Sequence, residues 1–164
     1  MGTILLPFSY GIDNVALEQA IIQARDHKAT LVPLSLICLS GHQDSPRLEL
    51  IQQSKDFLTL VQQKASRAGV HVERMESFTY DEVETIQKVA LELQCAYILL
   101  FARQQKGVLL PSETILKLMH NHIRPYFLSS LPAHKGVIML AEWRFRMRPQ
   151  RGIKSARQIA MGER

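Results

Sequence analysis

Apolar residues along this chain follow two alternating periods. Short apolar runs predict strands at residues 3–8, 30–39, 70–78, 95–101 and 126–128. Between these runs, apolar positions recur three and four residues apart, which predicts helices that begin near residues 13, 46, 81 and 112. Strands that alternate with helices form parallel sheets whose two faces the helices cover. We therefore expect an α/β fold, a doubly wound five-stranded parallel sheet with helices on both faces.

Several residues mark the ends of these elements. Side chains able to cap a helix N-terminus stand at Asp13 or Asn14, at Ser45 before Pro46, at Thr79 or Asp81, and at Ser112. Gly69 is expected to end the long second helix, because glycine readily adopts the left-handed conformation found there. Pro33 cannot donate a hydrogen bond to a strand ladder, so we expect it at the start of the second strand or at a bulge.

The net charge of +5 is concentrated near the C-terminus. Residues 1–132 contain 12 Lys and Arg against 13 Asp and Glu, whereas residues 133–164 contain 8 against 2. A chain of 164 residues is long enough to bury a substantial core. We therefore expect one α/β domain over residues 1–132 and a basic extension over residues 133–164.

The basic extension begins with an alternating segment, residues 136–148, whose polar positions become arginines. This period predicts a strand, either at the edge of the sheet within one chain or exchanged with a second copy in a homodimer. The alternative is a docking element for a protein partner, with apolar anchors and charge-assisted hydrogen bonds. Its candidate contact residues are Trp143, Arg144, Phe145, Arg146 and Arg148. A nucleic acid or an anionic membrane surface is a further possible partner, and residues 149–164 are expected to form a mobile tail.

The sequence contains no recognised catalytic or metal-binding motif. It has no nucleophile elbow, P-loop or dinucleotide fingerprint. His120 and His122 lie two positions apart, so they would not face each other on a helix. Cys38 and Cys95 have the character of free thiols in a reducing compartment. No apolar run approaches the ~20 residues of a membrane span. We therefore expect a cytoplasmic protein with no enzymatic activity, metal or cofactor.

Three parts of the chain resemble the universal stress protein family. Residues 4–7 and 13–20 resemble its first strand and the helix that follows. Residues 68–70 (Ala-Gly-Val) resemble the junction after its second helix. Residues 112–128 resemble the helix, proline and strand that close its fold. The resemblance covers about residues 3–131. It implies the doubly wound fold and a dimer formed through the last strand.

The resemblance also indicates where a nucleotide would bind. Nucleotide-binding members carry an Asp at the end of the first strand and a Gly-x2-Gly-x9-Gly-Ser/Thr loop after the fourth, whose backbone amides hold phosphates. Here the Asp position falls at Phe8 or Ser9, and Gly107 is the one glycine of residues 101–114. The residues that could still hold a nucleotide are Ser9, Arg103, Lys106 and Ser112. The alternative is a solvated loop over residues 103–106 and an ordinary helix cap at Ser112.

These observations lead to two hypotheses of function. The altered loop predicts that ATP does not bind in the family's usual mode. We therefore expect a non-catalytic, universal-stress-protein-like module that forms a homodimer and binds an unidentified protein partner through its basic extension. The alternative is a sensor that binds ATP or AMP through an altered phosphate loop.

Overall fold

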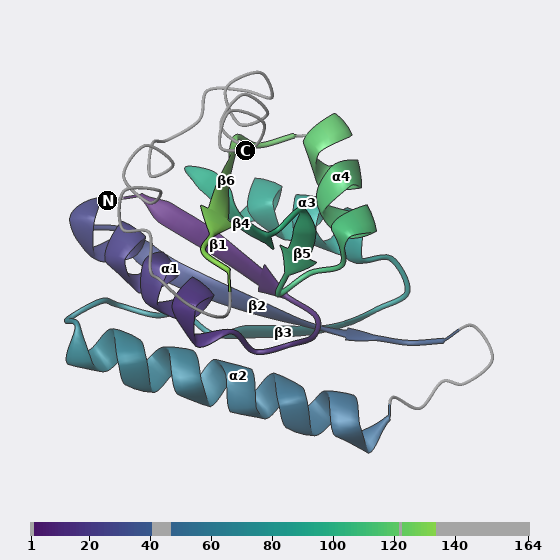
Figure 1. The fold of residues 1–164 in the computed structure, drawn as a ribbon, viewed down its shortest axis with the longest axis horizontal. Coiled ribbons are helices and arrows are strands. Elements are labelled where there is room, and N and C mark those ends of the chain that lie inside the picture. The colour runs from purple at the N-terminus through teal and green to yellow at the C-terminus, as the bar shows by residue number, and fades with distance from the viewer. Residues whose placement is uncertain (1, 41–46, 122, 134–164) are drawn as a thin grey trace.

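The computed structural model describes residues 2–40, 47–121 and 123–133, which form six strands and four helices (Figure 1). In chain order these are β1 (Thr3–Phe8), α1 (Asn14–Asp26), β2 (Thr30–Cys38), α2 (Leu48–Arg67), β3 (Met75–Thr79), α3 (Glu82–Glu92), β4 (Tyr97–Arg103), β5 (Lys106–Val108), α4 (Ser112–His120) and β6 (Tyr126–Leu131).

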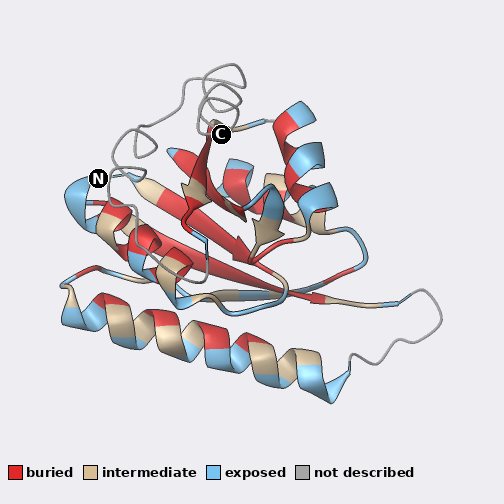
Figure 2. Cartoon of the chain, viewed as in Figure 1, coloured by how far each residue is buried: buried red, intermediate tan, exposed pale blue. Residues whose placement is uncertain are grey.

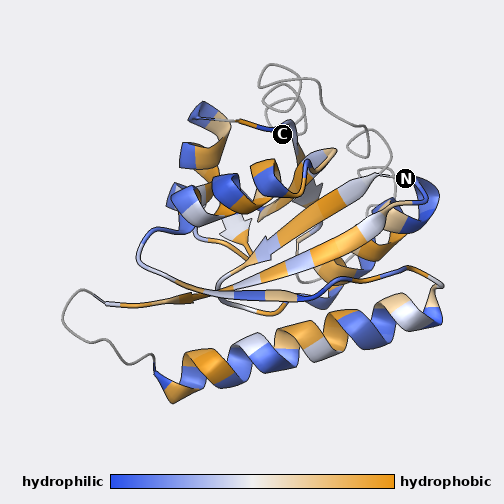
Figure 3. Ribbon diagram, turned by 180° about the vertical axis from the view of Figure 1, so that it is seen from behind, coloured by the Kyte–Doolittle hydropathy of each residue, from blue (hydrophilic) through white to orange (hydrophobic). Residues whose placement is uncertain are grey.

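The strands form one mostly parallel sheet with β1 near its middle. β1 pairs in parallel with β2 on one side and with β4 on the other, β3 pairs with β2, and β6 pairs with β4. β5 is a short antiparallel partner of β4. Helices α1 and α2 lie on one face of the sheet and α3 and α4 on the other (Figures 1 and 3). The predicted doubly wound α/β fold is therefore confirmed, with the antiparallel β5 as an addition.

The sheet separates two apolar cores (Figure 2). Side chains alternate across a strand, so Leu6 of β1 packs beneath α1 and α2 whereas Leu5 packs beneath α3 and α4. This explains the nearly continuous apolar run of β1, because a strand buried on both faces has no polar face. In the first core the rings of Phe8 and Phe57 stack with their centroids 4.0 Å apart, which joins α2 to the end of β1.

The residues expected at several element ends are found there. Asp13 caps α1 by accepting a hydrogen bond from the backbone N–H of Ala16 at 3.0 Å. Asp81, rather than Thr79, is the cap of α3. Gly69 follows α2 with a φ of +71°, in the left-handed region. These three predictions depend on local backbone chemistry, which the neighbouring sequence specifies directly.

Pro33 lies inside β2, opposite Leu6 of β1, so the prediction of a strand start or a bulge is wrong. The missing N–H of Pro33 faces β3, because the N–H of Leu31, two residues earlier, donates to His71 on that side. Pairing with β3 is accordingly interrupted after the bridge between Leu31 and Val72 and resumes at Leu34. This interruption also explains why β3 begins later than residue 70.

Several predictions fall outside the described residues. They concern the strand expected over residues 136–148 and the tail expected over residues 149–164, and also the side chains of Ser45 and Pro46. The prediction that Ser45 caps the second helix is wrong, because α2 begins at Leu48 with Arg47 at the cap position.

We expect the change Phe57→Ala to lower the free energy of unfolding by about 3–5 kcal/mol, because it removes a fully buried ring from the α2 side of the sheet. Gln63→Ala, at an exposed position of the same helix, is the matched control and should change stability by less than about 0.5 kcal/mol. Denaturant unfolding followed by circular dichroism measures both. Equal stabilities for the two variants would contradict the stabilising role of the Phe8–Phe57 ring pair.

Candidate functional site

The fold places its candidate site at the carboxyl end of the sheet, between β1 and β4. Chain connections leave these neighbouring strands in opposite directions, and ligands of doubly wound proteins bind in the crevice at such a point. Pairing between β1 and β4 covers only Ile4 with Tyr97 and Leu5 with Ile98. The next donor that faces β4 would be the N–H of residue 7, which is proline and has none. The two strands therefore part early.

The β4–β5 hairpin occupies the space where the strands part. Residues 106–108 pair in antiparallel register with residues 101–103 of β4. The two turn residues, Gln104 and Gln105, both have positive φ values, +49° and +65°, as in a type I′ turn. Sequence analysis missed this hairpin because Asn-Gly or Asp-Gly is the usual signal of such a turn, and Gln-Gln is not.

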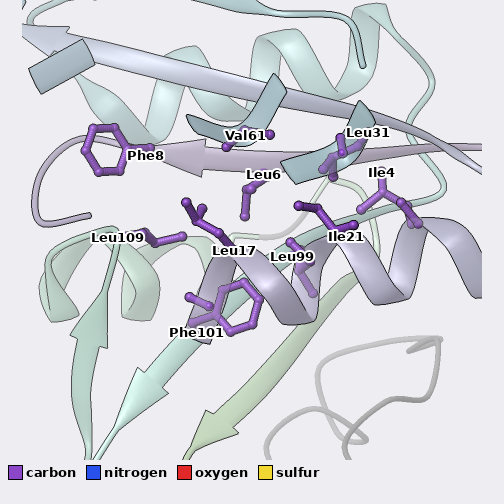
Figure 4. Close-up of a cluster of buried hydrophobic side chains, with 14 of the residues drawn as sticks. Ile4, Leu6, Phe8, Leu17, Ile21, Leu31, Val61, Leu99, Phe101 and Leu109 are labelled. Carbon is purple, nitrogen blue, oxygen red and sulfur yellow. The ribbon is translucent and has the colours of Figure 1, made fainter. Parts of the chain in front are cut away.

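Leu109 links the hairpin to the end of β1. Its backbone carbonyl accepts hydrogen bonds from the N–H groups of Ser9 at 2.9 Å and Tyr10 at 3.3 Å. Its side chain is 2% exposed and points toward Leu17 of α1 (Figure 4). Leu109 also has a φ of +70°, a conformation that costs a leucine free energy and persists only where surrounding contacts hold it. The chain thus supplies its own acceptor to amides that a ligand would otherwise meet.

Arg103 is buried and bound to groups of the same chain. Its guanidinium donates two hydrogen bonds to the Asp13 carboxylate, at 2.5 and 3.3 Å, and one to the Pro132 carbonyl at 2.8 Å. The arginine side chain is 7% exposed. Arg103 is therefore not part of a solvated loop, and its donors face α1 and the end of β6 rather than open solvent.

Gly107 and Ser112 shape the other side of the hairpin. The N–H of Gly107 donates to the Ser112 hydroxyl at 2.7 Å, and a Cβ at position 107 would lie 2.3 Å from the Leu110 carbonyl oxygen. Only glycine fits this close backbone approach. Ser112 is the first residue of α4, and the cap position is Pro111, so the prediction of Ser112 as the cap is wrong.

The four predicted nucleotide-binding residues are thus only partly brought together. Lys106 is exposed and pairs across the hairpin with Arg103, and Ser112 contacts the same hairpin through Gly107. Ser9 lies across the crevice at the end of β1, and its buried hydroxyl has no hydrogen-bond partner among the described residues. The cluster has one exposed cation, Lys106, and one buried, neutralised cation, Arg103.

Glu82 is a member of this region that sequence analysis interpreted only as part of an acidic helix start. It is the first residue of α3, and one of its carboxylate oxygens accepts a hydrogen bond from the Thr114 hydroxyl, in the first turn of α4, at 3.4 Å. The N-termini of both helices favour negative charge. An acidic side chain of the protein therefore already lies at the helix end where an anionic ligand would bind.

The thiols of Cys38 and Cys95 have raised pKa values and therefore low reactivity. Burial, together with the nearby Glu82 carboxylate, raises the pKa of Cys38 to about 11. Burial also raises the pKa of Cys95 to about 11. Both therefore stay protonated at neutral pH, and a thiol is a far weaker nucleophile and metal ligand than a thiolate. No cluster of three or more His, Cys, Asp or Glu side chains able to hold a metal occurs among residues 2–40, 47–121 and 123–133.

No helix of the described part of the chain is both long and apolar enough to cross a membrane.

We expect Arg103→Met to lower the free energy of unfolding by about 3–5 kcal/mol, because it removes the cation that balances the largely buried Asp13 carboxylate. The matched control is Lys117→Met, which breaks the exposed ion pair with Glu113 and should cost less than about 1 kcal/mol. Asp13→Asn in the Arg103→Met background should recover part of the loss. Denaturant unfolding of the single and double variants measures the coupling, and additive losses would contradict it.

No protein-family model matches the sequence, and no curated protein is significantly similar to it. Solved structures, however, share its fold. A universal stress protein family member from Burkholderia pseudomallei has a TM-score of 0.59 at 18% identity, over 77% of this chain and 94% of that one. A universal stress protein from Archaeoglobus fulgidus in complex with dAMP has a TM-score of 0.61 at 15% identity, over 78% and 97%.

A third similar structure is a universal stress protein family protein from Arabidopsis thaliana with AMP bound. Its TM-score is 0.56 at 10% identity, over 79% of this chain and 91% of that one. Each alignment spans nearly the whole of the other protein, so the shared part is the complete α/β domain. The resemblance seen in the sequence is thus confirmed for the fold: this chain has the fold of the universal stress proteins.

Proposed function

We propose that this chain is a non-catalytic module with the universal stress protein fold, which forms a homodimer and binds a protein partner through its basic extension, residues 133–164. The observation that carries the proposal is the set of internal contacts at the carboxyl end of the sheet. Leu109 accepts the hydrogen bonds of the β1 end, and Arg103 is neutralised by Asp13. A nucleotide would have to displace both contacts before it could use these groups.

The energetics of displacement favour an unliganded site. Separating a buried, hydrogen-bonded ion pair leaves two desolvated charges, and breaking such pairs costs about 3–5 kcal/mol. Backbone atoms of residues 110–112 lie where a side chain at position 107 would be, and the N–H of Gly107 already donates to the Ser112 hydroxyl. A ligand that binds only after this rearrangement loses the corresponding free energy from its affinity.

The main alternative is a nucleotide sensor with an altered loop. Two of the similar structures are described with dAMP and AMP, and the Ser9 hydroxyl, which has no hydrogen-bond partner among the described residues, follows β1 at the carboxyl end of the sheet. In this alternative Lys106 and Ser112 would contact the phosphate after the hairpin has moved. The alternative therefore predicts that a nucleotide stabilises the folded state, which can be measured.

We expect native mass spectrometry of the isolated protein to show a dimer without a bound small molecule, and AMP, dAMP and ATP to leave its melting temperature unchanged. A ligand present at 100 times its Kd would add about 2.7 kcal/mol to the stability, a rise of several degrees in a domain of this size. A saturable rise with AMP that Lys106→Ala removes, and that Lys88→Ala on the exposed face of α3 retains, would instead establish the nucleotide sensor.

The docking role of the extension predicts that its arginines are required for partner capture. We expect the full chain with Arg144, Arg146 and Arg148 changed to alanine to lose the partner in cross-linking and pull-down experiments, because charge-assisted hydrogen bonds are lost. The matched control removes three exposed basic side chains of the folded domain, Arg67, Arg74 and Lys88.

Two outcomes of this capture experiment would contradict the docking role of the extension. Equal loss in both triple variants would show that net charge, and not the extension, carries the contact. Captured material that consists of RNA or anionic lipid, with binding that collapses as salt rises, would replace the protein partner by one of the other two candidates.

A further inference from the structure

A surface groove lies beside the candidate site, between the loop after β1 and the first turns of α2. We call it the α2 groove. It has a volume of about 830 Å³, and its lining combines the apolar Ile12, Leu48 and Ile51 with polar and charged residues of α2, namely Glu49, Gln52, Gln53, Lys55 and Asp56. Leu48 is 81% exposed and Ile12 is 36% exposed. Apolar side chains of this size are usually buried, so a groove lined by them favours an apolar occupant.

The walls of the α2 groove are fixed within the folded domain. The N–H of Gly11 donates to the Gln53 side chain at 2.9 Å, which ties the loop after β1 to the helix. The Gln52 side chain donates to the Asp56 carboxylate at 2.9 Å across one helical turn. The groove is therefore formed before anything binds in it, which reduces the entropy that binding would cost.

We propose that the α2 groove binds the segment Trp143–Arg148 of the same chain. In an extended conformation alternate side chains point to one side, so Trp143 and Phe145 would enter the apolar groove together. Aromatic side chains are the residues that most often anchor a segment in such a pocket. The arginines that alternate with them would point away from the apolar residues, and their long side chains could reach the carboxylates of Glu49 and Asp56, which also line the groove.

The length of chain beyond the described residues allows this contact. β6 is parallel to β4, so Ala133 leaves the sheet at the same carboxyl end at which the α2 groove lies. Three strand spacings of ~4.8 Å and one layer spacing of ~10 Å separate β6 from the helix layer beyond β2. The ten residues from Ala133 to Trp143 can span up to ~33 Å. The segment can therefore reach the groove of its own chain.

Trp143 is the single tryptophan of the protein, so its fluorescence reports on this contact alone. We expect the emission of the full chain to be blue-shifted, and its quenching by acrylamide to be several-fold slower than that of free indole. In Leu48→Gln the emission should move toward that of exposed tryptophan and quenching should accelerate. Leu48 is too exposed for this change to unfold the domain, and circular dichroism verifies that it does not.

The matched control is Leu116→Gln, at a 55% exposed apolar position of α4, which should leave the emission unchanged. A second variant, Glu49→Gln with Asp56→Asn, should increase quenching most at low salt, because it removes the attraction to the arginines. The experiment needs neither a partner nor a nucleotide, so its outcome is separate from that of the proposed function.

Three results would overturn the proposal. The first is an emission of the unmodified chain that already matches free indole. The second is a shielded Trp143 that stays shielded in Leu48→Gln, which would place the segment elsewhere. The third is shielding that disappears on dilution, which would mean that the groove holds this segment from a second copy.

Discussion

The ion pair between Asp13 and Arg103 holds together the elements that meet at the carboxyl end of the sheet. Asp13 caps α1, Arg103 ends β4, and the same guanidinium reaches the carbonyl that follows β6. Three elements far apart in the sequence therefore meet at one pair of charges. Removing one member of such a pair lowers the free energy of unfolding strongly, because the other charge is then left desolvated without its counter-charge.

Beside this ion pair, backbone contacts of the β4–β5 hairpin lie between the carboxyl ends of β1 and β4. Pro7 lacks the N–H that would continue the pairing of β1 with β4, and this pairing ends at Leu5. At the β1–β4 gap the unpaired N–H of Ser9 then needs an acceptor, since buried backbone groups are almost always satisfied. The Leu109 carbonyl provides it, at the cost of a left-handed backbone conformation at a leucine.

The sequence specified the layers of the fold better than the contents of the crevice. Apolar periodicity located every parallel strand and all four helices, and the caps at Asp13 and Asp81 and the left-handed Gly69 followed from local chemistry. The β4–β5 hairpin was missed because Gln104 and Gln105 carry no turn signal, and the role of Arg103 because its partner is 90 residues away. Non-local pairings of this kind depend on the assembled sheet, and the sequence near either partner contains no signal that predicts them.

A crevice filled from within changes where this fold can interact with other molecules. The Ser9 and Tyr10 amides and the Arg103 cation are used internally, and Glu82 places a carboxylate beside the N-terminus of α4. The surfaces still open at the same end of the sheet are larger and more apolar, as the exposed Leu48 and Ile12 illustrate. Extended segments of protein bind such surfaces through side-chain anchors and charged rims, and they need no gap between the strands. These surfaces and internal contacts are the basis on which we propose a polypeptide, rather than a nucleotide, as the ligand at the carboxyl end of the sheet.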